Sequence, residues 1–280
     1  MKKETIPQKE KNMNYWNQST KNIYVAAHRG WRDEYPENTM PAFEAAVALG
    51  VDQLETDVRV TLDGELVLIH DATVDRTTNG KGKVCEKTLA ELRALDAGSH
   101  KGERFKGAQI PTFIEFMDYV KTLPTMTLDI ELKEYPTEGH EAIAYDVCDR
   151  VLKIIDDYGF TDRVVINTFS GALHEYIENK YGNKYRRHVY YPLSHLGKVT
   201  RDPYKTAYCC CMFRAMYNDI NIAEKEDFDR MAARGVQPWA GAKVRDEQGV
   251  DLAIKNGATL ITADNPDVIL DILRKKGYHA

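Results

Sequence analysis

Ionisable side chains follow four apolar runs of the sequence that have the pattern of β-strands. Carboxylates two residues apart on a strand point to the same side, so each pair can act on one point. The runs and their ionisable residues are 23–28 with His28 and Arg29, 53–60 with Glu55 and Asp57, 66–70 with His70 and Asp71, and 126–132 with Asp129, Glu131 and, just after it, Lys133.

Brought together, these residues could perform phosphoryl chemistry. Crowded carboxylates raise one another's pKa unless a cation joins them. A ligand set made only of oxygen suits Mg²⁺ or Ca²⁺ rather than zinc. Two histidines can serve as general base and general acid near neutral pH, and Arg and Lys side chains bind anionic phosphate. Each motif alone also fits a surface turn, a solvated strand or an ion pair, so it is their joint occurrence that favours a site.

Strand-like runs alternate with helical patterns along the chain, which indicates parallel strands joined by crossover helices. The predicted helices are 40–49, 113–121, about 140–158, and four near 171–181, 223–234, 247–256 and 266–275. The predicted strands are 23–28, 53–60, 66–70, 126–132, 163–168, 187–192, 208–213, 236–240 and 259–263.

Nine strands are predicted, one more than an eight-stranded barrel contains, and the run 66–70 is the additional strand. Asp63-Gly64 is a typical two-residue hairpin turn. It makes 66–70 antiparallel to 53–60 and predicts that Asp57 lies opposite His70. The predicted fold is α/β, a (β/α)8 TIM-type barrel with a hairpin and a small insertion after the second strand. In such barrels reactive residues lie at the carboxyl ends of the strands.

We expect one domain over residues 23–280, preceded by a flexible polar tail at 1–22. The insertion covers about 71–110 and contains one short helix, because Thr88-Leu89-Ala90-Glu91 forms a capping box.

The composition of the 280 residues excludes several classes of protein. Hydrophobic content of 43% argues against disorder, and a net charge of −5 gives no electrostatic footprint for nucleic acid. No apolar run is long enough for a membrane helix. The five cysteines are expected to be buried free thiols, which, with no signal-peptide pattern, favours the cytoplasm. A periplasmic or secreted location remains open if a signal peptide was removed, and the oligomeric state is left open.

In its order of motifs the chain resembles the glycerophosphodiester phosphodiesterase family. The likeness extends from about 23 to 272 and is densest over 25–133. The motifs are His28-Arg29-Gly30, Pro36-Glu37-Asn38-Thr39, Glu55-x-Asp57, Asp63-Gly64, His70-Asp71, Arg76-Thr77-Thr78-x-Gly80 and Glu131-x-Lys133.

The resemblance implies a site and a reaction. The implied roles are Glu55, Asp57 and Glu131 as ligands of one divalent cation, Mg²⁺ or Ca²⁺, His28 and His70 as the acid–base pair, and Arg29 and Lys133 as phosphate contacts. The substrate would be a small glycerophosphodiester, cleaved to glycerol 3-phosphate and an alcohol. In the implied mechanism the glycerol 2-hydroxyl attacks phosphorus, and water then opens the cyclic phosphate.

The last third of the chain departs from the family pattern. The family usually has a Trp-Thr-x-Asn stretch on its penultimate strand, whereas Trp239 is followed here by Ala240, Gly241 and Ala242. Trp239 is predicted as a substrate contact, with a place in the core as the equal alternative. Because of this difference, the sequence does not predict which alcohol is released from the substrate.

Two other functions compete with this interpretation. A related barrel lipid phosphodiesterase would need a docking surface, and the sequence has no basic amphipathic segment with large apolar residues, although lysines and arginines are frequent in 71–110. A non-catalytic barrel that binds a phosphate ligand would not need two histidines beside a metal site.

Overall fold

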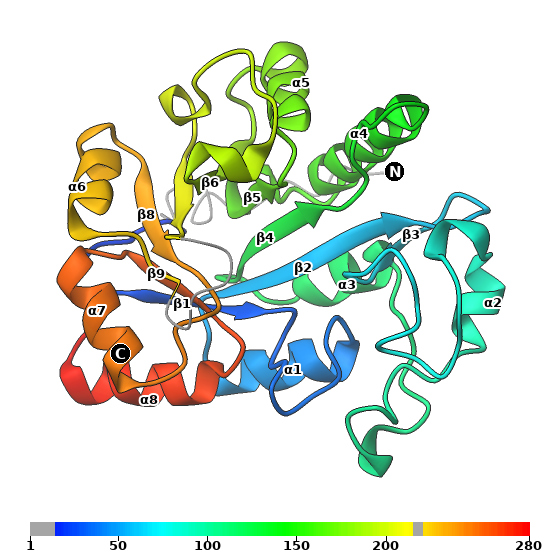
Figure 1. Cartoon of the computed structure of the whole chain (residues 1–280). Coiled ribbons are helices and arrows are strands. Elements are labelled where there is room, and N and C mark those ends of the chain that lie inside the picture. Colours follow the sequence, from blue (N-terminus) through cyan, green and yellow to red (C-terminus); the bar gives the residue numbers. More distant parts are fainter. Residues whose placement is uncertain (1–14, 215–220) are drawn as a thin grey trace, which may run out of the picture.

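A closed barrel of eight parallel strands organises the computed structural model, which describes residues 15–214 and 221–280 (Figure 1). Strand β1 pairs with β9 on one side and with β2 on the other, which closes the ring. The strands are β1 (Tyr24–His28), β2 (Gln53–Val60), β4 (Thr127–Leu132), β5 (Val164–Asn167), β6 (Arg186–Tyr191), β7 (Cys209–Met212), β8 (Gln237–Ala240) and β9 (Leu260–Ala263), with β3 (Leu66–Leu68) antiparallel to β2.

The helices surround this ring and bury its outer face (Figure 1). Strand β4 is covered by helices on one face and by the barrel interior on the other, so all six of its residues are buried, including the polar Thr127, Asp129 and Glu131. The α-helices are α1 (Met40–Leu49), α2 (Leu89–Arg93), α3 (Phe113–Val120), α4 (Glu141–Asp157), α5 (Gly171–Tyr181), α6 (Lys225–Ala233), α7 (Glu247–Asn256) and α8 (Pro266–Lys276). The predicted barrel, its strands and its helices are confirmed to within a few residues.

The hairpin register is the main error of the sequence-based prediction. Val60 pairs with Leu66, so Asp57 lies opposite Ile69 and not opposite His70. The loop contains three residues rather than two, because Gly64 takes a left-handed φ of 87° after a turn closed by its N–H and the Thr61 carbonyl. Such a loop shifts the pairing by one residue.

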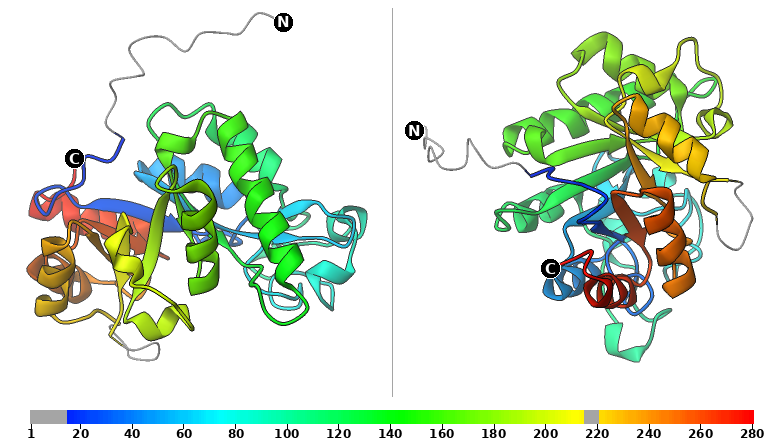
Figure 2. Two further views of the ribbon diagram at one scale, coloured as in Figure 1. Left: turned by 90° about the horizontal axis from the view of Figure 1, so that it is seen from above. Right: turned by 90° about the vertical axis from the view of Figure 1, so that its left-hand side faces the viewer.

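The insertion after β3 has a small hydrophobic core of its own and projects beside the barrel (Figure 2). Its capping box is confirmed, since Thr88 and Glu91 exchange hydrogen bonds at the start of α2. Besides α2 it contains two short 3₁₀ turns, Val84–Glu86 and Glu103–Phe105. Its core is made of Val67, Ile69, Val74, Val84, Leu92, Ala97 and Ile110.

Part of the predicted flexible tail instead packs against the barrel. The prediction for 1–14 lies outside the described residues, but Trp16 is 8% exposed in a cluster with Val165, Cys209 and Trp239. The Trp16 indole donates a hydrogen bond to the carbonyl of Asp162 (2.6 Å). Because the tail is mostly polar, the sequence did not predict that Trp16 packs against the amino-terminal end of the barrel.

Replacing Trp16 with alanine should lower the free energy of unfolding by about 3 kcal/mol, the usual cost of removing a buried tryptophan. Thermal unfolding should show a melting temperature lowered by several degrees. Lys21→Ala, at an exposed position of the same segment, is the control. Equal melting temperatures for the two variants would contradict this packing.

All five cysteines are free, and Cys148 and Cys209–Cys211 are buried as predicted. Cys85 differs, because it lies exposed in the insertion. Among the described residues, every helix is too short or too polar to cross a bilayer.

Candidate active site

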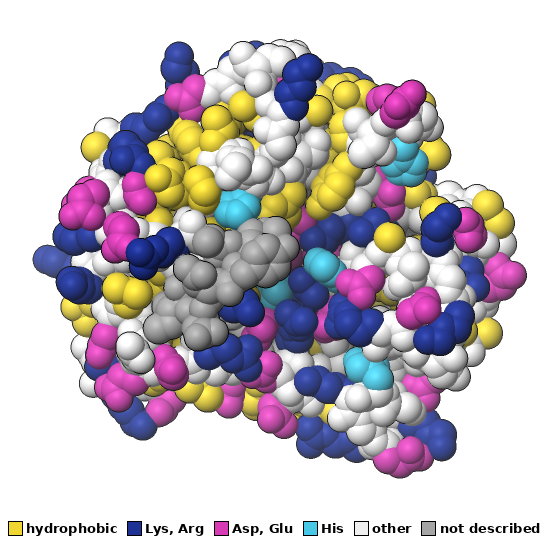
Figure 3. Space-filling model, viewed as in Figure 1, with side chains coloured by type: hydrophobic (Ala, Val, Ile, Leu, Met, Phe, Trp, Pro, Cys, Tyr) yellow, Lys and Arg dark blue, Asp and Glu magenta, His cyan; other side chains and the backbone are white. Residues whose placement is uncertain are grey.

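A cavity of about 360 Å³ opens at the carboxyl ends of the barrel strands. Lys, Arg and His side chains border the central hollow on the side of α1 and the insertion, and hydrophobic side chains gather on the opposite side (Figure 3). Each of the ionisable residues predicted for the site, except Asp57 and Asp71, lines this cavity. The strand ends therefore bring together the residues that the sequence singled out.

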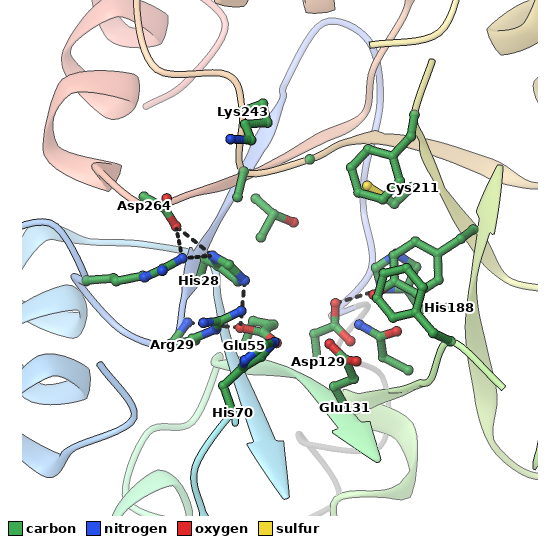
Figure 4. Close-up of a pocket in the computed structure, with 18 of the residues that line it drawn as sticks. His28, Arg29, Glu55, His70, Asp129, Glu131, His188, Cys211, Lys243 and Asp264 are labelled. Atoms are coloured by element: carbon green, nitrogen blue, oxygen red, sulfur yellow. Dashed lines mark hydrogen bonds and ion pairs between the residues drawn. The ribbon is translucent and has the colours of Figure 1, made fainter. Parts of the chain in front are cut away.

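Two histidines in the cavity are each held by a carboxylate, and Figure 4 shows the pair of His28 and Asp264. Nδ1 of His28 lies 2.6 Å from Oδ1 of Asp264, and Nδ1 of His70 lies 2.7 Å from Oδ1 of Asp71. A carboxylate at Nδ1 fixes the ring orientation and leaves Nε2 as the nitrogen available to a substrate. Burial lowers the pKa of both rings, that of His70 to about 4.

Three buried carboxylates, from Glu55, Asp57 and Glu131, converge beside these histidines. Each offers an oxygen within 4.8 Å of the others. The ammonium of Lys133 lies 2.5 Å from Glu131 Oε1 and 3.1 Å from Asp57 Oδ1. Arg29 adds its Nε atom at 3.1 Å from Asp57 Oδ2. The predicted ligands and phosphate contacts thus form one cluster.

The electrostatics of the cluster fit a cation. Burial and the neighbouring Asp57 raise the pKa of Glu55 well above its usual range, and burial also raises that of Glu131 despite Lys133. Although burial opposes it, Lys133 and Arg29 lower the pKa of Asp57. Lysine and arginine thus compensate the negative charge only in part. The site is built of oxygen donors, which are the ligands of Mg²⁺ and Ca²⁺.

A tight turn after β1 aims Arg29 at this cluster. Arg29 has a φ of 59°, and its N–H donates to Oε2 of Glu55 (2.9 Å). Gly30 follows with a φ of 78°, and a Cβ there would lie 2.6 Å from the backbone carbon of Ala42. Only glycine fits this close approach to α1, so the His-Arg-Gly sequence is required by backbone geometry as well as by chemistry.

Glu37 connects this turn to the insertion, and we refer to its contacts as the Glu37 hub. Its carboxylate accepts hydrogen bonds from Arg29 (3.0 Å), Arg32 (3.0 Å) and Arg76 (2.7 and 2.8 Å). Burial alone would raise the pKa of Glu37, but the arginines hold it well below its usual value. Arg32 also reaches Asp264, the partner of His28 (3.3 Å).

Trp239 does not line the cavity, so its predicted role as a substrate contact is wrong. The side chain is fully buried in the amino-terminal cluster of the barrel, where its indole donates to Oε1 of Gln18 (2.9 Å). The cavity wall is reached two residues later, at Gly241. The alternative position in the core is the one observed.

The opposite wall of the cavity is aromatic. Phe169, Tyr190 and Phe213 stack in series, with ring centroids 3.7 Å and 5.7 Å apart. Phe213 occupies space that a side chain at 241 would need, because a Cβ on Gly241 would lie 2.4 Å from its ring. The sequence after Trp239, which differs from the family pattern, therefore has a glycine at 241 where the aromatic wall of the cavity leaves no room for a side chain.

Several residues of the site have roles that the sequence did not assign. Glu37, Asn38 and Arg76 stood in recognised motifs, and Asn38 proves to donate to Oδ2 of Asp57 (2.8 Å). Nothing in the sequence pointed to His188, whose Nδ1 lies 2.7 Å from Oδ2 of Asp129. Only the pairing of strands brings it to the cavity.

A parallel barrel with carboxylate-held histidines and clustered carboxylates at the carboxyl ends of its strands has the features of a TIM-barrel enzyme that uses general acid–base catalysis. Comparison with known proteins specifies it further. The model of the glycerophosphoryl diester phosphodiesterase family matches residues 28–268. A glycerophosphodiester phosphodiesterase of Caldanaerobacter subterraneus subsp. tengcongensis is 34% identical over 90% of this chain and 98% of its own length. The chain belongs to the glycerophosphodiester phosphodiesterase family and is a phosphoric diester hydrolase.

Solved structures share the fold. A putative glycerophosphoryl diester phosphodiesterase from Silicibacter pomeroyi has a TM-score of 0.78 at 23% identity, covering 92% of this chain and 95% of its own. An Oleispira antarctica phosphodiesterase, solved with its product sn-glycerol-3-phosphate, has a TM-score of 0.72 at 24% identity. The coverage there is 90% of this chain and 97% of the Oleispira chain.

Proposed function

We propose that the protein hydrolyses glycerophosphodiesters to glycerol 3-phosphate and an alcohol, with His28 and His70 as the acid–base pair. The observation that carries the proposal is the joint geometry: two carboxylate-held histidines and a buried carboxylate triad in one cavity. The product bound by the Oleispira relative supports the choice of substrate.

Glu55, Asp57 and Glu131 would hold one divalent cation, Mg²⁺ or Ca²⁺. The oxygen donor set and the raised pKa of Glu55 and Glu131 support this assignment. When bound, the cation would stabilise the negative charge that grows on the phosphoryl oxygens. Arg29 and Lys133 would bind the same phosphate, since both cations lie beside Asp57.

The histidines would act in two steps. In the first, one neutral ring takes the proton of the glycerol 2-hydroxyl as this oxygen attacks phosphorus, and the other ring, protonated, gives its proton to the leaving alcohol oxygen. In the second, water opens the cyclic phosphate with the roles reversed. Asp264 and Asp71 keep each ring in the tautomer with Nδ1–H, so that Nε2 exchanges the protons.

The function is tested by measuring glycerol 3-phosphate release from a panel of glycerophosphodiesters with different headgroups. We expect release from at least one of them at a rate well above the uncatalysed reaction. Intact phospholipid and sphingolipid in the same panel test the lipid alternative. Cleavage of these lipids with no release from any glycerophosphodiester would contradict the proposal.

His28→Ala and His70→Ala should each lower kcat at least about 10²-fold, the usual scale of general acid–base catalysis. Substrate should still bind, because Arg29 and Lys133 remain. His279→Ala is the matched control, since His279 has a similar contact to a carboxylate, Asp52 (2.9 Å), away from the cavity. Near-normal turnover in either site variant would remove that histidine from the mechanism.

A further inference from the structure

Three side chains of the cavity have polar atoms without a partner, and the mechanism uses none of them. They are Asp129 on β4, Asn167 on β5 and His188 on β6, and we call them the acceptor floor. They are 0%, 2% and 3% exposed, yet all three line the cavity (Figure 4 labels Asp129 and His188). They come from neighbouring strands, since Asn167 pairs with His188 in the register of β5 and β6.

Each of these side chains is fixed by a contact at its other polar atom. Oδ2 of Asp129 lies 2.7 Å from Nδ1 of His188, and the Asn167 side chain lies beside Tyr190, whose pKa it lowers slightly against the larger effect of burial. The atoms left without a partner are Oδ1 of Asp129, Oδ1 of Asn167 and Nε2 of His188. The two oxygens accept hydrogen bonds, and so does Nε2 of a neutral ring with its proton on Nδ1.

Unpaired buried polar atoms are rare in native proteins because each costs stability. Three that face one cavity, two of them oxygens that can only accept, indicate that a donor-bearing group occupies the place during function. Neighbouring side chains cannot supply the donors, because among the described residues none reaches these atoms.

The acceptor floor adjoins the carboxylate cluster but is separate from it. Asp129 pairs with Glu55 in the register of β2 and β4, and Asn167 pairs with Glu131 in that of β4 and β5. Asp129 is nevertheless outside the group of oxygens that could hold an ion. A substrate whose phosphate lies at the cluster would therefore place an adjacent short arm on the floor.

Building on the proposed function, we propose that the acceptor floor is a specificity subsite for a hydrogen-bond-donating end group of the substrate, a hydroxyl or a primary ammonium. A hydroxyl supplies one donor and a primary ammonium supplies three. A methyl group supplies none and would leave the acceptors unpaired, which is the strongest means by which a site rejects an analogue. The group is either the terminal glycerol hydroxyl or the end of the leaving alcohol.

Two matched pairs of substrates distinguish these sources. The first pair compares glycerophosphoethanolamine with its propanol analogue, in which a methyl replaces the ammonium of the leaving group. The second compares glycerophosphoethanolamine with the diester of propane-1,2-diol, which keeps the attacking 2-hydroxyl and lacks the terminal one. The wild type should lose at least about tenfold in kcat/KM in one pair, the effect of leaving buried acceptors unpaired. The affected pair identifies the source.

Variants of the acceptor floor then test whether these three residues cause the difference in kcat/KM within the affected pair. Asn167→Leu and His188→Phe replace acceptors by apolar groups, and Asp129→Asn provides a variant of nearly unchanged shape. In these variants the affected ratio should fall toward one, whatever happens to the absolute rate. Thr262→Val changes another polar residue that lines the same cavity, and it should keep the wild-type ratio.

Ratios near one in both pairs for the wild type would overturn the proposal, as would a large ratio that the floor variants leave unchanged. Failure of the proposed function would show itself differently, as no cleavage of any glycerophosphodiester. In that case the same pairs, titrated calorimetrically onto the protein, give the ratio as binding constants. Equal affinities within both pairs would again overturn the proposal.

Discussion

Exhaustive removal of divalent cations should lower glycerol 3-phosphate release at least about 10³-fold, because a cation beside the phosphate contributes several kcal/mol of charge stabilisation. Addition of Mg²⁺ or Ca²⁺ should restore it. The buried triad of Glu55, Asp57 and Glu131 is the reason for this expectation. The measurement is turnover after treatment with a chelator, with the residual metal content determined on the same sample.

Charge-removing variants locate the cation. Glu55→Gln, Asp57→Asn and Glu131→Gln keep the shape of the side chains, and each should lose both activity and the rise in melting temperature that a bound ion gives the wild type. Asp118→Asn, at an exposed carboxylate on α3, is the control. Full activity after complete chelation would refute the metal dependence.

A substrate that lacks the glycerol 2-hydroxyl should be turned over at least about 10³-fold more slowly at saturation. Alignment of an intramolecular nucleophile can contribute up to roughly 7–11 kcal/mol, and the 2-deoxy analogue loses all of it. Among the described residues a single group of side chains could hold a metal, so the ligands for a second ion that would activate water are not provided.

The measurement is kcat for a glycerophosphodiester and its 2-deoxy analogue, together with phosphorus NMR of early time points for the cyclic phosphate. The propane-1,2-diol diester is the control, since it keeps the nucleophile. Equal turnover of the two substrates would mean that water attacks directly and that His28 and His70 have other roles.

Much of the site could be predicted because it depends on strand ends and alternation. His28 ends β1 and Glu131 is next to last in β4, whereas Glu55 and Asp57 alternate with apolar residues within β2, and the parallel barrel brings these positions together. No knowledge of long-range contacts is needed for that step. The nine strands were predictable for the same reason, since their apolar runs are bounded by turn residues.

Features that depend on one-residue geometry or on strand pairing could not be predicted. The register of the hairpin changes with the conformation of Gly64, which Asp63-Gly64 as a sequence does not specify. Trp239 was placed by a motif, but the cavity is reached two residues later, at Gly241 just after β8. His188 gained a partner only through the neighbouring strands, and Trp16 stood alone in a polar segment.

The Glu37 hub gives the insertion a second connection to the site, besides the contact of Asp71 with His70. Arg76 of the insertion, Glu37, Arg32 and Asp264 form a continuous series of ionic contacts that ends at His28. These ionic contacts already exist in the folded chain before substrate binds. The charged groups of the protein therefore do not have to reorient when a phosphodiester enters the site. The insertion therefore helps to hold the site in place from outside the barrel, through the guanidinium of Arg76.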